Sequence, residues 1–303
     1  MGPLLFILYV NDIVNSSQYI HFILYADDTT LLFHEDSCER LINRVNLELL
    51  NLSIWFKANK LSLNISKTNF MVFGTQKFDK NKFTDSIRIE NCIIDQVDVI
   101  KFLGVYIDSK LSWKHHISQL SLTISRNIGV LYKLRQKLPD SAMLTLYNAL
   151  ILPHLMYCIV VWGCAGKSQM DRLRILQKRS IRIITNSIYN AHTSPLFLKL
   201  RTLKLEDIFI LQILLFVFNT RYPPCAKNVC SFFYRFQFYY SFSNYSIRPT
   251  KKRLYVPYFR TEVRRHSISC IGAILFNKFP LLTEATSFVT MKKQIKLHFM
   301  NSF

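Results

Sequence analysis

Two adjacent carboxylates, Asp27 and Asp28, interrupt an apolar stretch that runs from Ile20 to Phe33. The flanking residues are β-branched, aromatic or Leu, a pattern that predicts a tight β-hairpin with both carboxylates at its turn. Two neighbouring negative charges repel each other, and a divalent cation would offset that repulsion. Mg²⁺ prefers such oxygen ligands and completes its shell with phosphates and water. The alternative is that Asp-Asp is simply a favourable turn dipeptide, and the pair alone leaves both readings open.

Further segments occur in a recognisable order around this pair. Tyr25-Ala26-Asp27-Asp28 resembles the catalytic hairpin of reverse transcriptases, in the form found in non-LTR retrotransposons. The stretch 2–13 resembles the end of the preceding family motif, 61–73 the following block, and 101–108 the hairpin that grips the primer terminus. The resemblance extends to about Phe218 and more loosely to the end of the chain.

The resemblance implies a chemistry and a set of roles. The reaction is an in-line attack of a primer 3′ hydroxyl on the α-phosphate of a deoxynucleotide, with an RNA template and a DNA primer as partners. Two Mg²⁺ ions stabilise the attacking and leaving oxygens. The matching catalytic and metal-binding residues are Asp27 and Asp28, and those that match nucleotide-binding or primer-binding positions are Tyr25, Lys67, Phe102, Leu103 and Gly104.

The family's metal site needs a third carboxylate from a strand that would precede residue 1. We therefore expect a reverse transcriptase fragment that is inactive or very weak by itself. The alternative is a noncatalytic nucleic-acid-binding remnant.

The elements that must position these residues are predicted to form an α+β structure. A partial polymerase palm, an antiparallel sheet with packed helices, is expected over 1–108, a mainly helical thumb over 109–222, and a basic aromatic tail over 223–303. Apolar residues at helical spacing predict one long helix from Glu39 to Lys57, with Asp36 as its N-cap, and another from Ile117 to Leu138. Paired prolines after Tyr222 mark the last boundary.

The positive charge is concentrated in the second half. The chain has a net charge of +20; residues 1–139 carry 16 basic and 13 acidic side chains, whereas residues 140–303 carry 23 and 6. Such an excess is typical of a half that contacts phosphates, although an anionic membrane surface would attract it too. A basic helix in this region is predicted to follow a nucleic-acid backbone, and a solvated charged face is the alternative. Its cations are Arg172, Arg174, Lys178, Arg179 and Arg182.

From residue 142 to 166 no side chain is formally charged, a length that could span a bilayer. Asn148, Pro153 and His154 near its centre favour two buried helices joined near Pro153 instead, so we expect no membrane span. A basic membrane-associated protein is the third and least favoured function.

The remaining signals are weak. Cys225 and Cys230, with His266 and Cys270, match no strong zinc-site spacing and are interpreted as buried or free thiols. The aromatic residues of the tail are expected to form core more than to stack on bases. The N-terminal residues show no targeting pattern, so we expect an intracellular protein, in nucleus or cytoplasm, that is not secreted.

Overall fold

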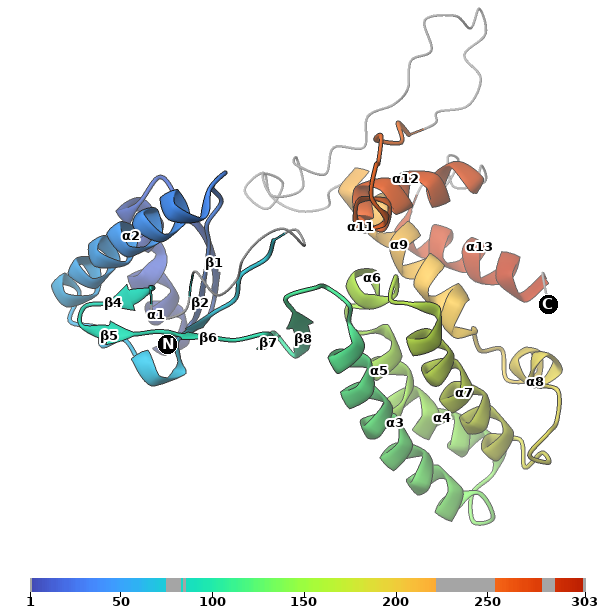
Figure 1. Ribbon diagram of the computed structural model, residues 1–303. Helices are drawn as coiled ribbons and strands as arrows, with labels where there is room; N and C mark the ends of the chain where they lie inside the picture. The colour runs from blue at the N-terminus through green and yellow to red at the C-terminus, as the bar shows by residue number, and fades with distance from the viewer. Residues whose placement is uncertain (1, 75–82, 84–85, 222–253, 280–286, 302–303) are drawn as a thin grey trace, which may run out of the picture. The chain divides into compact units, whose positions relative to one another are not determined.

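The structure is a computed structural model that describes residues 2–74, 83, 86–221, 254–279 and 287–301. The chain divides into two compact units, Met1–Leu111 and Ser112–Phe303 (Figure 1). The first unit mixes helices with small sheets and the described part of the second is helical, which confirms the α+β class. The assignment of palm, thumb and tail stays a prediction.

Where the structure describes it, the first unit contains helices and four separate two-stranded sheets. Its elements are α1 (Gly2–Val10), η1 (Asn11–Ser16), β1 (His21–Tyr25), β2 (Asp28–Leu32), α2 (Cys38–Ala58), η2 (Ile65–Lys67), β3 (Asn69–Phe70), β4 (Arg88–Ile89), β5 (Cys92–Ile93), β6 (Asp95–Gln96), β7 (Val99–Phe102) and β8 (Val105–Asp108). The pairs β1–β2, β4–β5 and β7–β8 are antiparallel. The pair β3–β6 is parallel, which corrects the expected antiparallel sheet, because the chain passes through the β4–β5 hairpin and returns beside β3 in the same direction.

The core of the first unit lies between α2 and the short strands. Leu49 and Leu52 of the apolar stripe are buried, as helical periodicity predicts. Helix α2 extends one residue beyond each predicted end, and its N-cap is Ser37 instead of Asp36. The Ser37 hydroxyl accepts a hydrogen bond from the Arg40 backbone N–H at 3.3 Å, which satisfies a donor of the first turn.

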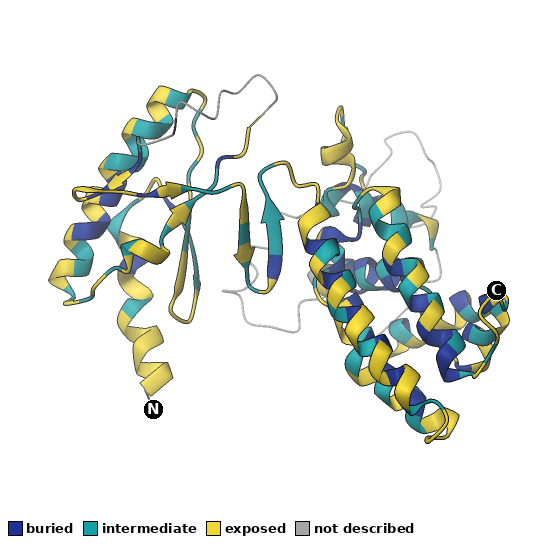
Figure 2. Cartoon of the chain, turned by 60° about the horizontal axis from the view of Figure 1, so that its bottom comes forward, coloured by how far each residue is buried: buried dark blue, intermediate teal, exposed yellow. Residues whose placement is uncertain are grey.

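Helix α1 is apolar but contains no buried residue among those described (Figure 2). Leu4, Leu5 and Leu8 are each at least 60% exposed. The Tyr9 hydroxyl donates to the Asn59 carbonyl and so connects α1 to the residue that follows α2.

The described part of the second unit is built from helices only. They are α3 (Lys114–Leu134), α4 (Asp140–Leu150), α5 (Leu152–Met156), α6 (Ile159–Trp162), α7 (Lys167–Ile184), α8 (Thr193–Lys199), α9 (Leu205–Arg221), α11 (Glu262–Arg265), α12 (Ile268–Lys278) and α13 (Phe288–Asn301). Helix α3 packs along α7, and α12 and α13 both pack against α9. Helix α3 ends at Leu134 instead of the predicted Leu138, since the residues before Pro139 leave the helix.

The uncharged run of residues 142–166 forms parts of α4, all of α5 and all of α6, which is three helices instead of the predicted two. Pro153 lies in the first turn of α5, where its missing N–H is tolerated, and a second break occurs at Cys158, whose φ is 51°. Within the described parts of the chain, no helix is long and apolar enough to cross a membrane.

Several predictions for the tail fall outside the described residues. These include the proline boundary, Cys225, Cys230 and the aromatic cluster before Leu254. Cys270 is buried in α12. Over the described ranges there is no group of three or more His, Cys, Asp or Glu side chains that could hold a metal ion.

Candidate metal and nucleic-acid sites

The Asp27–Asp28 pair lies at the tip of the β1–β2 hairpin, as the sequence predicts. Tyr25 and Asp28 are opposite each other as the last cross-strand pair, so Ala26 and Asp27 form a two-residue turn. Ala26 has φ of 52°, in line with the positive φ of the turns that suit right-handed strand twist. The strands are half-buried toward the core and become exposed at the tip.

The side chains at this tip face solvent. Tyr25 is 62% exposed, and both carboxylates are also exposed. Two adjacent exposed carboxylates can donate oxygens to a hard divalent cation, and both would remain accessible to phosphate oxygens and water. The donor set therefore fits part of a site for a hard divalent cation.

The second predicted hairpin, β7–β8, has its turn at Leu103 and Gly104. Both residues have positive φ, 44° and 83°, which is the pattern of a type I′ turn. Glycine adopts this region without strain, whereas leucine is held there at a cost of about 1–2 kcal/mol. Phe102 before the turn is half-buried and Val105 after it is buried, so the strands anchor a strained tip.

Lys67 is the last residue of η2 and is exposed. Its backbone N–H donates to the Asn64 carbonyl at 3.1 Å. The structure thus places this cation on a short hydrogen-bonded turn before β3.

The structure does not join these predicted residues into one sheet. The β1–β2 and β7–β8 hairpins are separate two-stranded sheets, and η2 precedes a third pair. The roles of Tyr25, Lys67 and the β7–β8 turn stay predictions.

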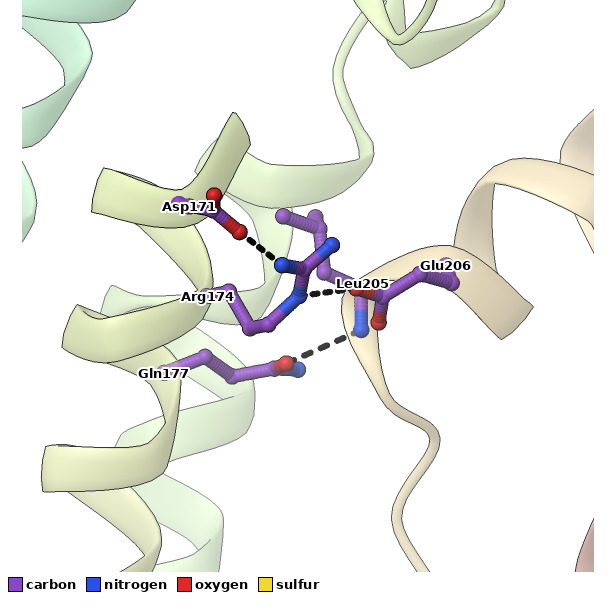
Figure 3. Close-up of polar contacts among 5 residues, drawn as sticks. All are labelled: Asp171, Arg174, Gln177, Leu205 and Glu206. Carbon is purple, nitrogen blue, oxygen red and sulfur yellow. Dashed lines mark hydrogen bonds and ion pairs between the residues drawn. The ribbon is translucent and has the colours of Figure 1, made fainter. Parts of the chain in front are cut away.

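The basic helix is α7, and its basic side chains differ in exposure and in their partners. Arg172 and Arg179 are exposed and Lys178 is half-buried. Arg174 forms ion pairs with Asp171 and Glu206 (Figure 3). Arg182 donates from Nε to the Ala191 carbonyl at 2.9 Å.

Sequence reasoning missed a buried polar cluster between α7, α4 and the start of α9. Gln177 is 1% exposed, and its Nε2 donates to the Tyr147 hydroxyl and to the Leu203 carbonyl, both at 3.0 Å. Its Oε1 accepts from the Leu205 backbone N–H at 2.9 Å (Figure 3). Burial raises the pKa of Tyr147 to about 12, so its hydroxyl stays neutral. The signal in the sequence is a Gln within the apolar stripe of a helix, where a buried amide needs partners.

Comparisons with known proteins agree with the resemblance seen in the sequence. Residues 1–107 match the family model described as "Reverse transcriptase (RNA-dependent DNA polymerase)". Residues 1–107 belong to the reverse transcriptase family. This segment contains the Asp27–Asp28 turn, Lys67 and the Leu103–Gly104 turn.

Curated relatives of the chain come from transposons of Drosophila melanogaster. The chain is 28% identical to "Probable RNA-directed DNA polymerase from transposon BS" in an alignment 220 residues long, which covers 68% of the chain and 24% of that protein. It is 25% identical to "Probable RNA-directed DNA polymerase from transposon X-element" over 69% of the chain and 23% of the relative. For "RNA-directed DNA polymerase from mobile element jockey" these values are 23%, 68% and 23%.

The chain thus spans about a quarter of the length of these relatives, all of which are non-LTR retrotransposon proteins, as predicted. No solved structure matches the chain significantly.

Proposed function

We propose that the chain is the rear part of a non-LTR retrotransposon polymerase palm followed by thumb helices, and that it serves RNA-directed DNA synthesis. Asp27 and Asp28 would hold Mg²⁺, Lys67 would lie near the nucleotide, and the β7–β8 turn near the primer. The observation that carries the proposal is the exposed Asp-Asp tip of the β1–β2 hairpin inside a segment that matches the reverse transcriptase family.

In this reaction the carboxylates of the hairpin would hold a divalent cation close to the phosphate oxygens of the substrate. When bound, Mg²⁺ supplies positive charge to the attacking and leaving oxygens. Asp27 and Asp28 themselves contribute oxygen ligands from a turn whose backbone is fixed by strand pairing. Tyr25, opposite Asp28, would present an aromatic face beside the carboxylates.

Metal binding by the hairpin is testable without catalysis. We expect Mn²⁺, as a paramagnetic substitute for Mg²⁺, to bind the purified chain in electron paramagnetic resonance titrations. Asp27→Asn should weaken this binding because it removes one anionic ligand. The matched control is Asp95→Asn, which neutralises another exposed Asp of the same unit, at the start of β6. Binding that does not depend on Asp27 would contradict the proposed ligand role.

Primer extension on an RNA template tests the enzymatic part. Two carboxylates make up only part of a two-metal site, so we expect little or no Mg²⁺-dependent incorporation by these 303 residues. Processive synthesis that Asp27→Asn abolishes would show that the chain is a complete catalyst and would overturn this expectation.

The second candidate function is noncatalytic binding of an RNA–DNA hybrid. Its support is the excess of positive charge in residues 140–303 and the exposure of Arg172 and Arg179 on α7. Hybrid binding that falls steeply with salt would support this function, because docked cations release counterions from phosphates. If the chain binds the hybrid and no metal binds at Asp27, the noncatalytic function is the better description.

A further inference from the structure

The segment after α7 is held in a defined shape by backbone hydrogen bonds. The Ser187 N–H donates to the Arg182 carbonyl at 2.9 Å, and the Asn186 N–H donates to the Ile183 carbonyl at 3.3 Å. Asn186 has φ of 49°. Together these are the features of a Schellman motif, which ends a helix and sets the direction of the chain that leaves it.

A second turn follows at once and is tied back to the helix. The Ala191 N–H donates to the Ile188 carbonyl at 3.1 Å, which closes a four-residue turn with Tyr189 and Asn190 at its centre. The Ala191 carbonyl accepts from Arg182 Nε at 2.9 Å, and this bond connects the turn to the last turn of α7. The backbone that carries Tyr189 is therefore positioned next to the C-terminal end of α7.

The side chains at this turn are almost fully exposed. Tyr189 is 86% exposed and Ile188 is 72% exposed. A large aromatic ring gains stability when it is buried, so a structured turn that holds one in solvent indicates a surface for a partner. We call Ile188 and Tyr189 the aromatic turn.

The charge on α7, the helix that precedes the aromatic turn, indicates what kind of partner fits. Arg172 and Arg179 are seven residues apart on α7, which is about two turns, so both lie on one face of the helix. Both are exposed, and Ile175 between them is 64% exposed. Asp171, the acidic residue of α7, forms an ion pair with Arg174. The exposed face that carries Arg172 and Arg179 is therefore positively charged.

We propose that the aromatic turn stacks an unpaired base of a single-stranded nucleic acid, while Arg179 and Arg172 hold its phosphates. The proposal rests on the nucleic-acid partner of the proposed function. It adds that this partner is single-stranded and that Tyr189 contacts one of its bases. An aromatic platform beside cations is the arrangement that binds single strands, because every base offers a flat face for stacking. A base inside a duplex has both faces covered by its neighbours and cannot stack on Tyr189.

The test measures binding of a 12-nucleotide single-stranded RNA and of a blunt RNA–DNA hybrid to the purified 303-residue chain by fluorescence anisotropy. Tyr189→Ala should weaken single-strand binding roughly 5- to 140-fold, whereas hybrid binding should stay the same. Tyr189→Phe keeps the ring and should bind like the parent chain. The matched control is Tyr132→Ala, which removes an exposed Tyr of α3 whose ring is already covered by Arg135 at 4.3 Å and should have no effect.

The salt dependence separates stacking from charge. Tyr189→Ala should leave the slope of log affinity against log salt unchanged. The double change Arg172→Ala and Arg179→Ala should reduce that slope by about 1.4, since each phosphate contact on a single strand contributes about 0.7. Because the changed side chains are exposed, circular dichroism should show the same helix content in every variant.

The failures of the two proposals are distinguishable. If the hybrid and the single strand bind in an arginine-dependent way but Tyr189→Ala changes nothing, the aromatic turn is not a base platform and the proposed function stands. If Tyr189→Ala instead abolishes self-association in sedimentation experiments without changing RNA affinity, the turn docks a second copy of the chain and the inference is wrong. If neither nucleic acid binds, both proposals fall.

Discussion

Tyr25 and Asp28 face each other as the last cross-strand pair of the β1–β2 hairpin. Directly opposed residues project to the same side of a two-stranded sheet, with Cβ atoms about 5 Å apart. The phenol ring and one carboxylate are therefore neighbours at an exposed tip, and Asp27 lies between them in the turn. This arrangement suggests that the tip contributes to binding more than to stability.

The first prediction separates these two contributions. In the absence of divalent metal, Asp27→Asn and Asp28→Asn should change the free energy of unfolding by less than about 0.5 kcal/mol, because both side chains are exposed. With Mg²⁺ at about 100 times its Kd, the parent chain should gain about 2.7 kcal/mol and each variant less. Urea unfolding with and without Mg²⁺ measures both effects. A loss above about 2 kcal/mol without metal would indicate a structural role instead.

Two glycines should respond in opposite ways to the same substitution. Gly104→Ala should destabilise the β7–β8 hairpin by about 1–2 kcal/mol, because a Cβ is strained at a φ of 83°. Gly129→Ala lies within α3, where a Cβ would meet nothing within 4 Å, and should stabilise that helix by up to about 1 kcal/mol. Hydrogen–deuterium exchange of peptides from β7–β8 and from α3 measures each change locally. Equal behaviour of the two variants would contradict the assigned turn geometry.

Gln177 should be the most sensitive polar residue of the second unit. Gln177→Ala leaves the Leu205 N–H and the Leu203 carbonyl buried without this partner, and should cost about 2–4 kcal/mol. Tyr147→Phe removes one hydroxyl and should cost about 1 kcal/mol. Urea unfolding of both variants and of the double variant tests the contact, since the double change should cost less than the sum. Simple additivity would show that the two side chains do not interact.

His116 should make the second unit sensitive to mild acid. Burial, followed by the nearby charge of His115, lowers the pKa of His116 below its ordinary value of 6.5. The unfolded chain then binds the proton more readily, so stability is highest above pH 6.5 and declines as the pH falls toward the folded pKa. Urea unfolding between pH 8 and 5 should show this decline, and His116→Gln should flatten it. The control His154→Gln changes an exposed histidine and should keep the decline.

Much of the local structure could be predicted from the residues themselves. The apolar runs around Asp27–Asp28 indicate the β1–β2 hairpin, and the stripe that includes Leu49 and Leu52 indicates α2. Both patterns are set by interactions over a few residues. The N-cap of α2 was misassigned by one residue, because Ser37 and the neighbouring Asp36 can both cap a helix.

The backbone conformation of the β7–β8 turn was harder to predict from the sequence. Gly104 marks a turn, but nothing in the sequence indicates that Leu103 also adopts positive φ. Strand pairing on both sides forces that conformation on leucine, and such pairing is visible only in the folded unit.

The sequence by itself determined the family of residues 1–107, the position of the two carboxylates and the basic character of the second half, since each depends on residue type and order. Only the tertiary structure decided how those cations are used. Arg174 is engaged by Glu206 across 32 residues of chain, and Gln177 meets Tyr147 across 30. Arg182 supports the turn that exposes Tyr189. Contacts of this range follow from helix packing, which brings together residues whose separation no local pattern encodes.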